Sequence, residues 1–215
     1  MPSDTIRRIV GAYDDPIVRL YSWGRFTIMR QRFLEEIGQY LPASGVVLDI
    51  GCGFGLFSLY YAATAAGRVV RGIDVNRRRI ALARRAAARL GLPNAVYEEG
   101  DARHFKGDSE VAAAYMLDIV HHVPPASVPP LLAQLHRALM PGGMLLVKDV
   151  DSRPAAKRWF TWVLDKAMDP RAPVHYWPSE ALGGALEHAG FSVRRHLMVD
   201  VLPYPHVLYV CTRRP

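Results

Sequence analysis

The fold of this chain is decided by ten residues, Val46-Val47-Leu48-Asp49-Ile50-Gly51-Cys52-Gly53-Phe54-Gly55. The first five are apolar except for one acid, as expected for a strand that is buried on both faces. Three glycines follow at alternate positions, and an apolar, helix-like stretch, 56–66, comes next. A strand, a glycine loop and a helix bring backbone N–H groups and a helix N-terminus against a ligand. Glycine suits such a loop because a Cβ would hold the ligand off and because the turn needs positive φ.

The glycine spacing separates two kinds of nucleotide site. A dinucleotide fingerprint needs glycine at the first, third and sixth loop positions, and the sixth position here is Leu56. The pattern D-x-G-C-G-x-G instead resembles motif I of the class I S-adenosylmethionine-dependent methyltransferases. The resemblance implies that the loop packs under the methionine part of the cofactor and that the acid helps hold its amino group. It thereby assigns to cofactor binding Asp49, Gly51, Cys52, Gly53 and Gly55. The alternative is a buried strand that ends in an ordinary glycine-rich turn.

Two further acids follow predicted strands. Asp74 ends the strand 68–74 and stands 23 positions beyond Gly51, close to the offset of about 20 residues expected for a ribose ligand. The stretch Gly72-Ile73-Asp74-Val75-Asn76 resembles the family's second motif, which makes Asp74 the ribose residue and Val75 a cofactor contact. Capping of the next helix is the alternative for Asp74. After the short strand 95–98, Asp101 and Ala102 stand where the family reads adenine, the first through its carboxylate and the second through its N–H.

A fourth apolar strand, 111–117, runs into Leu117-Asp118-Ile119-Val120-His121-His122-Val123-Pro124. This stretch resembles the fourth motif of the family's small-molecule branch and implies a cofactor contact at Leu117. The paired histidines allow three interpretations. His122 is the candidate general base for a substrate hydroxyl, since imidazole titrates near neutral pH. Adjacent histidines without spaced partners make a poor metal site, so none is predicted. The third interpretation is that one ring packs on the cofactor and the other orders the loop.

The length, composition and net charge of the chain limit the class of protein. With 215 residues, 50% of them hydrophobic and 22% charged, the chain fits one sizeable globular domain. No apolar run approaches the ~18–20 residues that cross a bilayer, and the N-terminus lacks a signal-peptide core, so we expect a cytoplasmic protein. Cys52 and Cys211 suit a reducing compartment. The net charge of +7 permits a nucleic acid or an anionic membrane, but much of it lies on the predicted helix 76–90, as on a solvated face.

Three regions outside the motifs offer candidate substrate contacts, with packing as the alternative for each. The first ~45 residues are predicted to be helical, with Asp15-Pro16 starting a helix that carries Tyr21. The stretch 152–177 is rich in tryptophan and basic residues and reads as core, as a hydrophobic lid or as a membrane-surface helix; its candidate is Trp159. The last two strands must form an antiparallel hairpin, whose tip offers Tyr204 and His206 at the carboxyl edge of the parallel strands.

Together these elements predict a doubly wound α/β protein. A turn at Met140-Pro141-Gly142-Gly143 and a fifth strand, 144–150, complete the family's order of motifs. The resemblance implies a mostly parallel, seven-stranded Rossmann-like sheet of order 3-2-1-4-5-7-6, with strand 7 antiparallel. We expect a helical cover at 1–44 and a methyltransferase domain at 45–215, with a lid-like insertion at about 152–177.

The expected function is methyl transfer from S-adenosylmethionine to oxygen or carbon of a small apolar or aromatic metabolite, including a carrier- or lipid-linked one. Nucleobase amines are disfavoured, because the Asn/Asp-Pro-Pro-aromatic motif of such enzymes is replaced here by Leu117-Asp118-Ile119-Val120. An RNA or protein methyltransferase guided by the basic surface is the alternative, as is a cofactor-binding module without turnover. Nucleic acid is not expected as a partner, peripheral membrane contact is not favoured, and the oligomeric state is left open.

Overall fold

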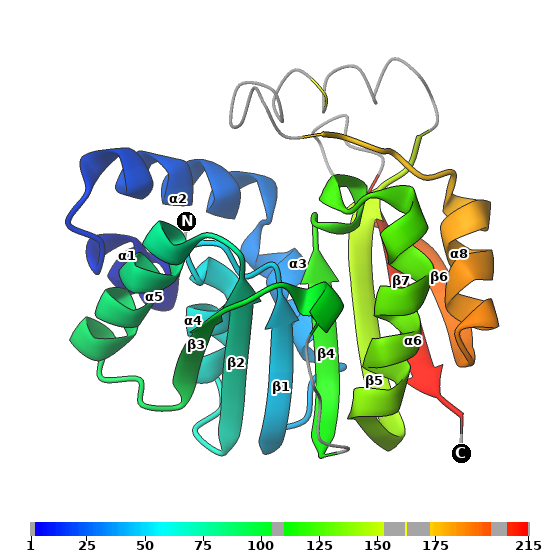
Figure 1. Ribbon diagram of the computed structural model, residues 1–215. Coiled ribbons are helices and arrows are strands. Elements are labelled where there is room, and N and C mark those ends of the chain that lie inside the picture. The colour runs from blue at the N-terminus through cyan, green and yellow to red at the C-terminus, as the bar shows by residue number, and fades with distance from the viewer. Residues whose placement is uncertain (1–2, 105–109, 153–161, 163–172, 199–205, 215) are drawn as a thin grey trace. The chain divides into compact units, whose positions relative to one another are not determined.

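The computed structural model describes residues 3–104, 110–152, 162, 173–198 and 206–214. Seven strands form one sheet, with the order β3-β2-β1-β4-β5-β7-β6 (Figure 1). The pairs β1–β2 and β2–β3 are parallel, whereas β7 runs antiparallel to both β5 and β6. The predicted fold class and strand order are therefore confirmed. The strands are β1 (Gly45–Ile50), β2 (Arg68–Asp74), β3 (Ala95–Glu99), β4 (Val111–Leu117), β5 (Leu139–Val150), β6 (Phe191–Met198) and β7 (His206–Arg213).

The chain divides into two compact units, and the division falls within β4. The first unit takes residues 1–105 and 111–113, and the second takes 106–110 and 114–215. The predicted helical cover, 1–44, is thus part of the same unit as β1, β2 and β3. Most of the predicted insertion, 152–177, lies outside the described residues. The α-helices are α1 (Asp4–Gly11), α2 (Pro16–Ile28), α3 (Gln31–Gly38), α4 (Leu56–Ala63), α5 (Arg77–Leu90), α6 (Val128–Ala138) and α8 (Ser179–His188).

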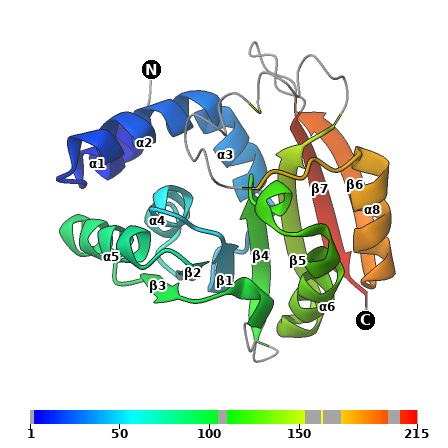
Figure 2. The same cartoon turned by 45° about the horizontal axis from the view of Figure 1, so that its top comes forward.

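In the first unit, helices pack on the apolar strands. Helix α4 lies on β2, α5 lies on β2 and β3, and α1 contacts both helices (Figures 1 and 2). Val47, Leu48 and Val70, from the paired strands β1 and β2, are completely buried. The predicted start of α2 is confirmed, since the Asp15 carboxylate accepts from the N–H groups of Ile17 and Val18.

In the second unit, β5 is longer than predicted. It begins at Leu139 and continues through the expected turn, where Gly142 has a φ of 75°. Pro141 and Gly142 therefore bend a strand instead of separating a helix from one. At the other end of β5, Val150 pairs with His206, which also pairs with Met198 of β6. This register places the start of β7 beside the carboxyl end of β5, as the hairpin argument predicts.

Candidate cofactor and active site

The glycine loop leaves β1 through three residues in the left-handed region. Gly51, Gly53 and Gly55 have φ values of 74°, 56° and 78°, which only glycine adopts at little cost. The N–H groups of Gly51 and Cys52 donate to the carbonyl oxygen of Ile73, at 2.8 and 3.1 Å. The loop is thereby fixed to the end of the neighbouring strand β2, and α4 begins directly after it.

Asp74, the last residue of β2, joins three of the predicted motifs. One carboxylate oxygen accepts from the Gly53 N–H at 2.9 Å, and the other accepts from the Asn76 N–H at 2.8 Å. The carbonyl oxygen of Asp74 accepts from Gly100 N–H at 3.1 Å, which ties the segment before Asp101 to the same point. A carboxylate offers about four lone-pair positions, so two backbone donors leave it room for ribose hydroxyls. The same geometry thus allows Asp74 both to cap the start of the next helix and to bind a ribose.

Space around the glycines differs from one position to the next. A Cβ on Gly55 would lie 2.6 Å from the Tyr97 hydroxyl, and one on Gly72 would lie 2.7 Å from the same ring. Tyr97 is buried and donates to the carbonyl of Gly55, so these two positions are filled by the protein itself. A Cβ on Gly53 would meet nothing within 4 Å. Gly53 therefore borders open space, which fits a cradle for a ligand that approaches the backbone closely.

Two side chains of the loop region are turned inward. The Asp49 carboxylate is buried and accepts from the Ser58 hydroxyl at 2.5 Å, so it holds the start of α4. Burial, together with the carboxylates of Asp49 and Asp74, raises the pKa of the Cys52 thiol well above its usual value. Cys52 is consequently a neutral thiol at physiological pH and not a nucleophile. Contact of Asp49 with a cofactor amino group stays a prediction.

The predicted adenine residues and Val75 are half-buried or exposed. Asp101 binds the guanidinium and N–H of Arg103, and this carboxylate raises the pKa of the Arg103 guanidinium. Ala102 begins a short 3-10 helix, η1 (Ala102–His104). Val75 is 69% exposed, a large value for an apolar side chain at the end of a buried strand. These groups lie where a ligand across the ends of β2 and β3 would cover them.

The N-terminal region contacts the glycine loop at Phe54, through Tyr13 between α1 and α2 and through Tyr21 of α2. The Tyr13 hydroxyl donates to the Phe54 carbonyl oxygen at 2.8 Å, and the Tyr21 ring meets the Phe54 ring edge-on at 5.2 Å between centroids. Burial raises the pKa of Tyr13, so its hydroxyl keeps the proton that it donates. The Arg79 guanidinium lies 5.5 Å from the centre of the same ring. Tyr21 is therefore positioned beside the predicted cofactor loop.

In the second unit, the residues that follow β4 are locked to the end of β5. Asp118 has a φ of 58°, the one left-handed non-glycine residue in the described ranges. Its N–H donates to the carbonyl of Lys148 at 2.9 Å, and the buried Lys148 ammonium donates back to its carboxylate at 2.5 Å. Breaking such a buried pair is costly, so the strained turn is held firmly. Leu117, the predicted cofactor residue, is buried directly before it.

Asp149, which follows Lys148 in β5, orients the histidine pair. Its carboxylate accepts from the backbone N–H of His121 at 3.0 Å and lies 2.5 Å from His121 Nδ1. Both side chains are buried, and the rings of His121 and His122 lie 4.2 Å apart. His122 is half-buried, and its Nδ1 lies 3.2 Å from the carbonyl oxygen of Pro173. A carbonyl only accepts, so Nδ1 of His122 carries a proton and Nε2 is the basic nitrogen of the neutral ring.

The comparisons with known proteins agree with this architecture. A family model described as a methyltransferase domain matches residues 24–196. The chain belongs to the methyltransferase domain family. The predicted class I S-adenosylmethionine-dependent methyltransferase is therefore confirmed.

Relatives of this methyltransferase have diverse names. An uncharacterized methyltransferase of Synechocystis is 30% identical over 156 residues, 70% of this chain and 69% of the relative. A ubiquinone biosynthesis O-methyltransferase of Pseudomonas paraeruginosa is 32% identical over 118 residues, 53% of this chain and 48% of the relative. The match thus spans about half the length of that relative. The crystal structure of the cyclase SpnF superposes with a TM-score of 0.71 at 19% identity, covering 85% of this chain and 80% of SpnF, which shows a shared fold.

The predicted site residues of this methyltransferase fall into three groups: those in the first unit, those in the second unit and those outside the described residues. The structure brings Gly51, Gly53, Asp74 and the Gly100 segment together through hydrogen bonds in the first unit. His122 and His206 belong to the second unit, where His206 is buried at the start of β7. Trp159 and Tyr204 lie outside the described residues.

Sequence reasoning missed the pairing partners Asp149 and Lys148. A signal was present, since two adjacent charged residues interrupt the otherwise apolar end of β5. Charged residues in a buried strand need partners, so they should have been sought among the polar residues at the ends of neighbouring strands.

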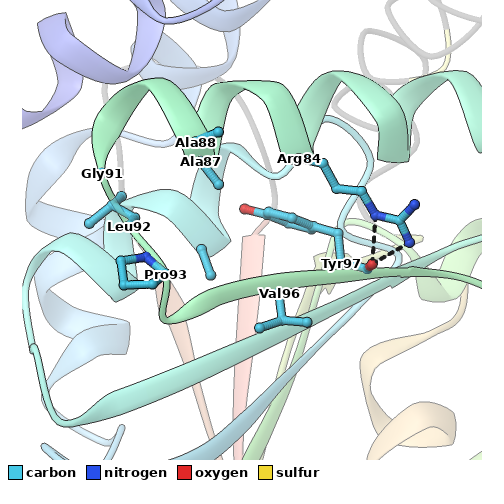
Figure 3. Close-up of a pocket in the computed structure, with 9 residues that line it drawn as sticks. Arg84, Ala87, Ala88, Gly91, Leu92, Pro93, Val96 and Tyr97 are labelled. Atoms are coloured by element: carbon cyan, nitrogen blue, oxygen red, sulfur yellow. Dashed lines mark hydrogen bonds between the residues drawn. The ribbon is translucent and has the colours of Figure 1, made fainter.

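Within the described ranges, no group of three or more His, Cys, Asp and Glu residues could hold a metal ion, and no helix there is long and apolar enough to span a bilayer. A depression of about 450 Å³ lies between the C-terminal half of α5 and the edge strand β3, where the Arg84 guanidinium donates twice to the Tyr97 carbonyl (Figure 3). It contains none of the predicted cofactor residues. It is lined by Arg84, Ala87, Ala88, Gly91, Leu92, Pro93, Ala95, Val96 and Tyr97.

Proposed function

We propose that this methyltransferase transfers a methyl group from S-adenosylmethionine to oxygen or carbon of a small apolar or aromatic metabolite, including a lipid- or carrier-linked one. The observation that carries the cofactor part is the loop around Gly53, which borders open space and is tied by its N–H to the Asp74 carboxylate. When bound, the cofactor supplies a methyl group on a cationic sulfur, which leaves as a neutral thioether when the acceptor's electron pair forms the new bond.

The predicted cofactor residues at the ends of β1, β2 and β3 each have a part in holding the cofactor. The glycine loop takes the methionine part, since its backbone can approach the ligand without a Cβ between them. The remaining lone pairs of Asp74 accept from the ribose hydroxyls, which makes a charge-assisted pair of hydrogen bonds. Asp101 and Ala102 bind the adenine. The Asp101 carboxylate then accepts from the adenine as well as from the Arg103 guanidinium. Val75 becomes covered by the cofactor, which accounts for an exposed valine at a strand end.

The second unit supplies a candidate base. Proton transfer to His122 Nε2 would activate a hydroxyl acceptor as it attacks the methyl group. The Pro173 carbonyl supports this role because its hydrogen bond fixes the tautomer of His122. The hydrogen bond between Asp149 and His121 supports it because it holds the residue directly before His122 in place. For a carbon acceptor, the same nitrogen would remove the proton that the methylated carbon loses.

The state of Asp118 and the names of relatives both bear on the chemical class of the acceptor. Asp118 follows β4, where enzymes acting on nucleobase amines carry their motif, but its carboxylate is bound to Lys148. It is therefore engaged in holding the turn and not offered to an amine. The ubiquinone biosynthesis O-methyltransferase supports oxygen of a small apolar molecule as the acceptor class. The cyclase SpnF shares the fold, so turnover has to be tested through the fate of the methyl group.

Cofactor binding is tested by calorimetry. The wild-type chain is expected to bind S-adenosylmethionine, and Asp74→Ala should weaken binding by ~1.5–3 kcal/mol, which is roughly 10- to 150-fold in Kd. The matched control is Glu99→Ala, which removes the exposed carboxylate paired in register with Asp74 on β3. Equal losses in the two variants, or no binding by the wild type, would contradict the assignment.

Catalysis is tested by screening acceptors while detecting the demethylated cofactor. With an acceptor found, His122→Ala should lower kcat ~100-fold or more and leave the Kd of the cofactor unchanged. His188→Ala is the control, because His188 is an exposed histidine on α8. An unchanged kcat in His122→Ala would reduce the residue to a packing role. Turnover only with RNA, lost steeply as salt rises, would favour the alternative substrate class.

A further inference from the structure

A tyrosine from outside the glycine loop holds one of the loop's carbonyl groups. Tyr13 lies in the short segment between α1 and α2, 41 positions before Phe54 in the sequence. Its side chain is only 1% exposed, and its hydroxyl donates to the Phe54 carbonyl oxygen at 2.8 Å. Burial raises the pKa of this hydroxyl, so it keeps its proton and remains a donor at any physiological pH. The loop is thus held by a residue that belongs to none of the predicted cofactor motifs.

The backbone around Tyr13 is itself anchored by three helices. Arg19 of α2 donates through Nε to the Tyr13 carbonyl oxygen. Arg89 of α5 donates to the carbonyl oxygen of Ala12 at 2.9 Å, and the Tyr13 N–H donates to the carbonyl of Val10 in α1 at 3.4 Å. Because its own backbone is fixed, the tyrosine can impose one orientation on the group that its hydroxyl binds.

The peptide unit between Phe54 and Gly55 needs such a partner. Gly55 has a φ of 78°, and glycine adopts positive and negative φ about equally well, so this peptide unit can turn over at little steric cost. A peptide group is planar and trans, so its carbonyl and its N–H point in opposite directions and turn over together. In the structure the N–H donates to the Cys52 carbonyl at 2.8 Å, and the carbonyl accepts from Tyr13.

The orientation of this peptide unit decides whether the cradle for the ligand is formed. The hydrogen bond from Gly55 to Cys52 closes a four-residue turn, and Gly53 lies within that turn. Gly53 is the loop residue that borders open space, and its N–H donates to the Asp74 carboxylate. Turning the peptide unit over would break the bond to Cys52 and open the turn. The orientation that Tyr13 stabilises is therefore the one in which the turn is closed.

The next carbonyl of the loop is held in another way. The Gly55 carbonyl accepts from the Leu59 N–H of α4 at 2.9 Å and from the Tyr97 hydroxyl at 3.3 Å. The helix already sets its orientation, so the Tyr97 hydroxyl is a second donor there. Phe54 precedes the helix, and within the described residues the donor to its carbonyl is the Tyr13 hydroxyl. Loss of that hydroxyl therefore has the larger consequence for the loop.

We propose that Tyr13 is a positioning residue of the cofactor site, which selects the loop conformation that receives the methionine part of S-adenosylmethionine. The proposal rests on the proposed function, because it takes the cradle at Gly53 as the cofactor site. Without the hydroxyl, the turned-over peptide unit would be populated in the free protein. The apparent Kd would then rise by the inverse of the fraction that stays competent to bind. The nucleoside part would be little affected, since Asp74 and Asp101 are proposed to hold it.

Calorimetry with two ligands tests this role. S-Adenosylhomocysteine contains the whole amino-acid part, whereas 5′-methylthioadenosine keeps the nucleoside and the sulfur but lacks that part. Tyr13→Phe keeps the buried ring and removes only the hydroxyl, so the variant should fold. It should raise the Kd of S-adenosylhomocysteine ~5- to 10-fold, as expected for the loss of one hydrogen bond. The Kd of 5′-methylthioadenosine should change less than ~2-fold.

Tyr209→Phe is the matched control. Tyr209 is also buried, and its hydroxyl donates to the Ser179 carbonyl at 3.0 Å, but it belongs to the second unit. Each variant loses one hydrogen bond from a tyrosine to a backbone carbonyl, so both should lower the melting temperature by a similar amount. Only Tyr13→Phe should weaken the binding of S-adenosylhomocysteine.

The outcomes separate this role from the proposed function. An unchanged Kd of S-adenosylhomocysteine in Tyr13→Phe would overturn the positioning role. An equal loss of affinity for both ligands would also overturn it, because a general effect on the fold gives that result. Either outcome leaves the cofactor site standing where the wild type binds and Asp74→Ala weakens binding. No binding of S-adenosylhomocysteine by the wild type would overturn the cofactor site and the role of Tyr13 together.

Discussion

The glycines of the first unit show how one residue type serves two purposes. Gly55 and Gly72 are required because the Tyr97 ring occupies the place of their Cβ atoms. Gly53 has the same left-handed backbone as Gly55 but nothing near its missing Cβ. Its need for glycine therefore has two sources, the positive φ and the space that a ligand would fill.

Gly53→Ala should separate these two sources. Alanine in the left-handed region costs ~1–2 kcal/mol, so the variant should fold with slightly lower stability. Cofactor affinity should fall at least ~10-fold, because the added methyl group enters the cradle.

The control for this prediction is Gly91→Ala, which has a φ of 66° and also meets nothing within 4 Å. It should lose the same stability, measured by thermal denaturation, and bind the cofactor normally in calorimetry. Normal binding by Gly53→Ala would place the cofactor elsewhere.

At the scale of elements, α2 depends on its first turn. Asp15 accepts from two N–H groups of the helix and also from Arg78 of α5. Tyr21, one turn further on, contacts Phe54 of the glycine loop. A weaker start of the helix would therefore loosen the contact between α2 and the predicted cofactor site.

Asp15→Ala should remove the cap and lower stability by about 1 kcal/mol. For a chain of this length, that corresponds to a fall of about 2–4 °C in melting temperature. Ser127→Ala is the control, since Ser127 precedes α6 but makes no capping hydrogen bond through its side chain. Differential scanning calorimetry measures both. Equal melting temperatures for wild type and Asp15→Ala would show that the cap contributes little.

At the scale of the whole molecule, the positive charge of α5 is largely engaged within the first unit. Arg84 binds the Tyr97 carbonyl, Arg89 binds Ala12 and Asp14, and Arg78 binds Asp15. These arginines join α5 to β3 and to the segment between α1 and α2. The observation weakens the case for an RNA-binding patch on this helix, since these arginines contact the protein itself instead of only solvent.

Cofactor binding should also stabilise the chain as a whole. A ligand at 100 times its Kd that binds only the folded state adds ~2.7 kcal/mol. We therefore expect S-adenosylmethionine at that excess to raise the melting temperature by roughly 5–10 °C. Thermal denaturation with ATP is the control, because ATP shares the adenosine but lacks the sulfonium side chain. An equal rise with ATP would indicate a less specific nucleotide site.

The sequence alone determined those features that depend on neighbouring residues. An apolar strand followed by left-handed glycines and a helix is local, so the loop at Gly51–Gly55 and the start of α2 at Asp15 were predictable. The order of strands was implied by the resemblance of the ordered motifs to the class I methyltransferases, and the sheet confirms it. The longer β5 was missed because Pro141-Gly142 usually marks a turn and here bends a strand.

Only the tertiary structure decided which distant residues meet. The pairs Lys148–Asp118 and Asp149–His121 join residues about 30 positions apart, and Tyr97 fills the space beside Gly55 and Gly72. The exposure of Ile17 and Leu20 was likewise invisible in the sequence, where both fit the helical spacing expected for a core. The physical reason is that burial and pairing depend on strand register and on how helices pack, and these are set by contacts across the whole chain.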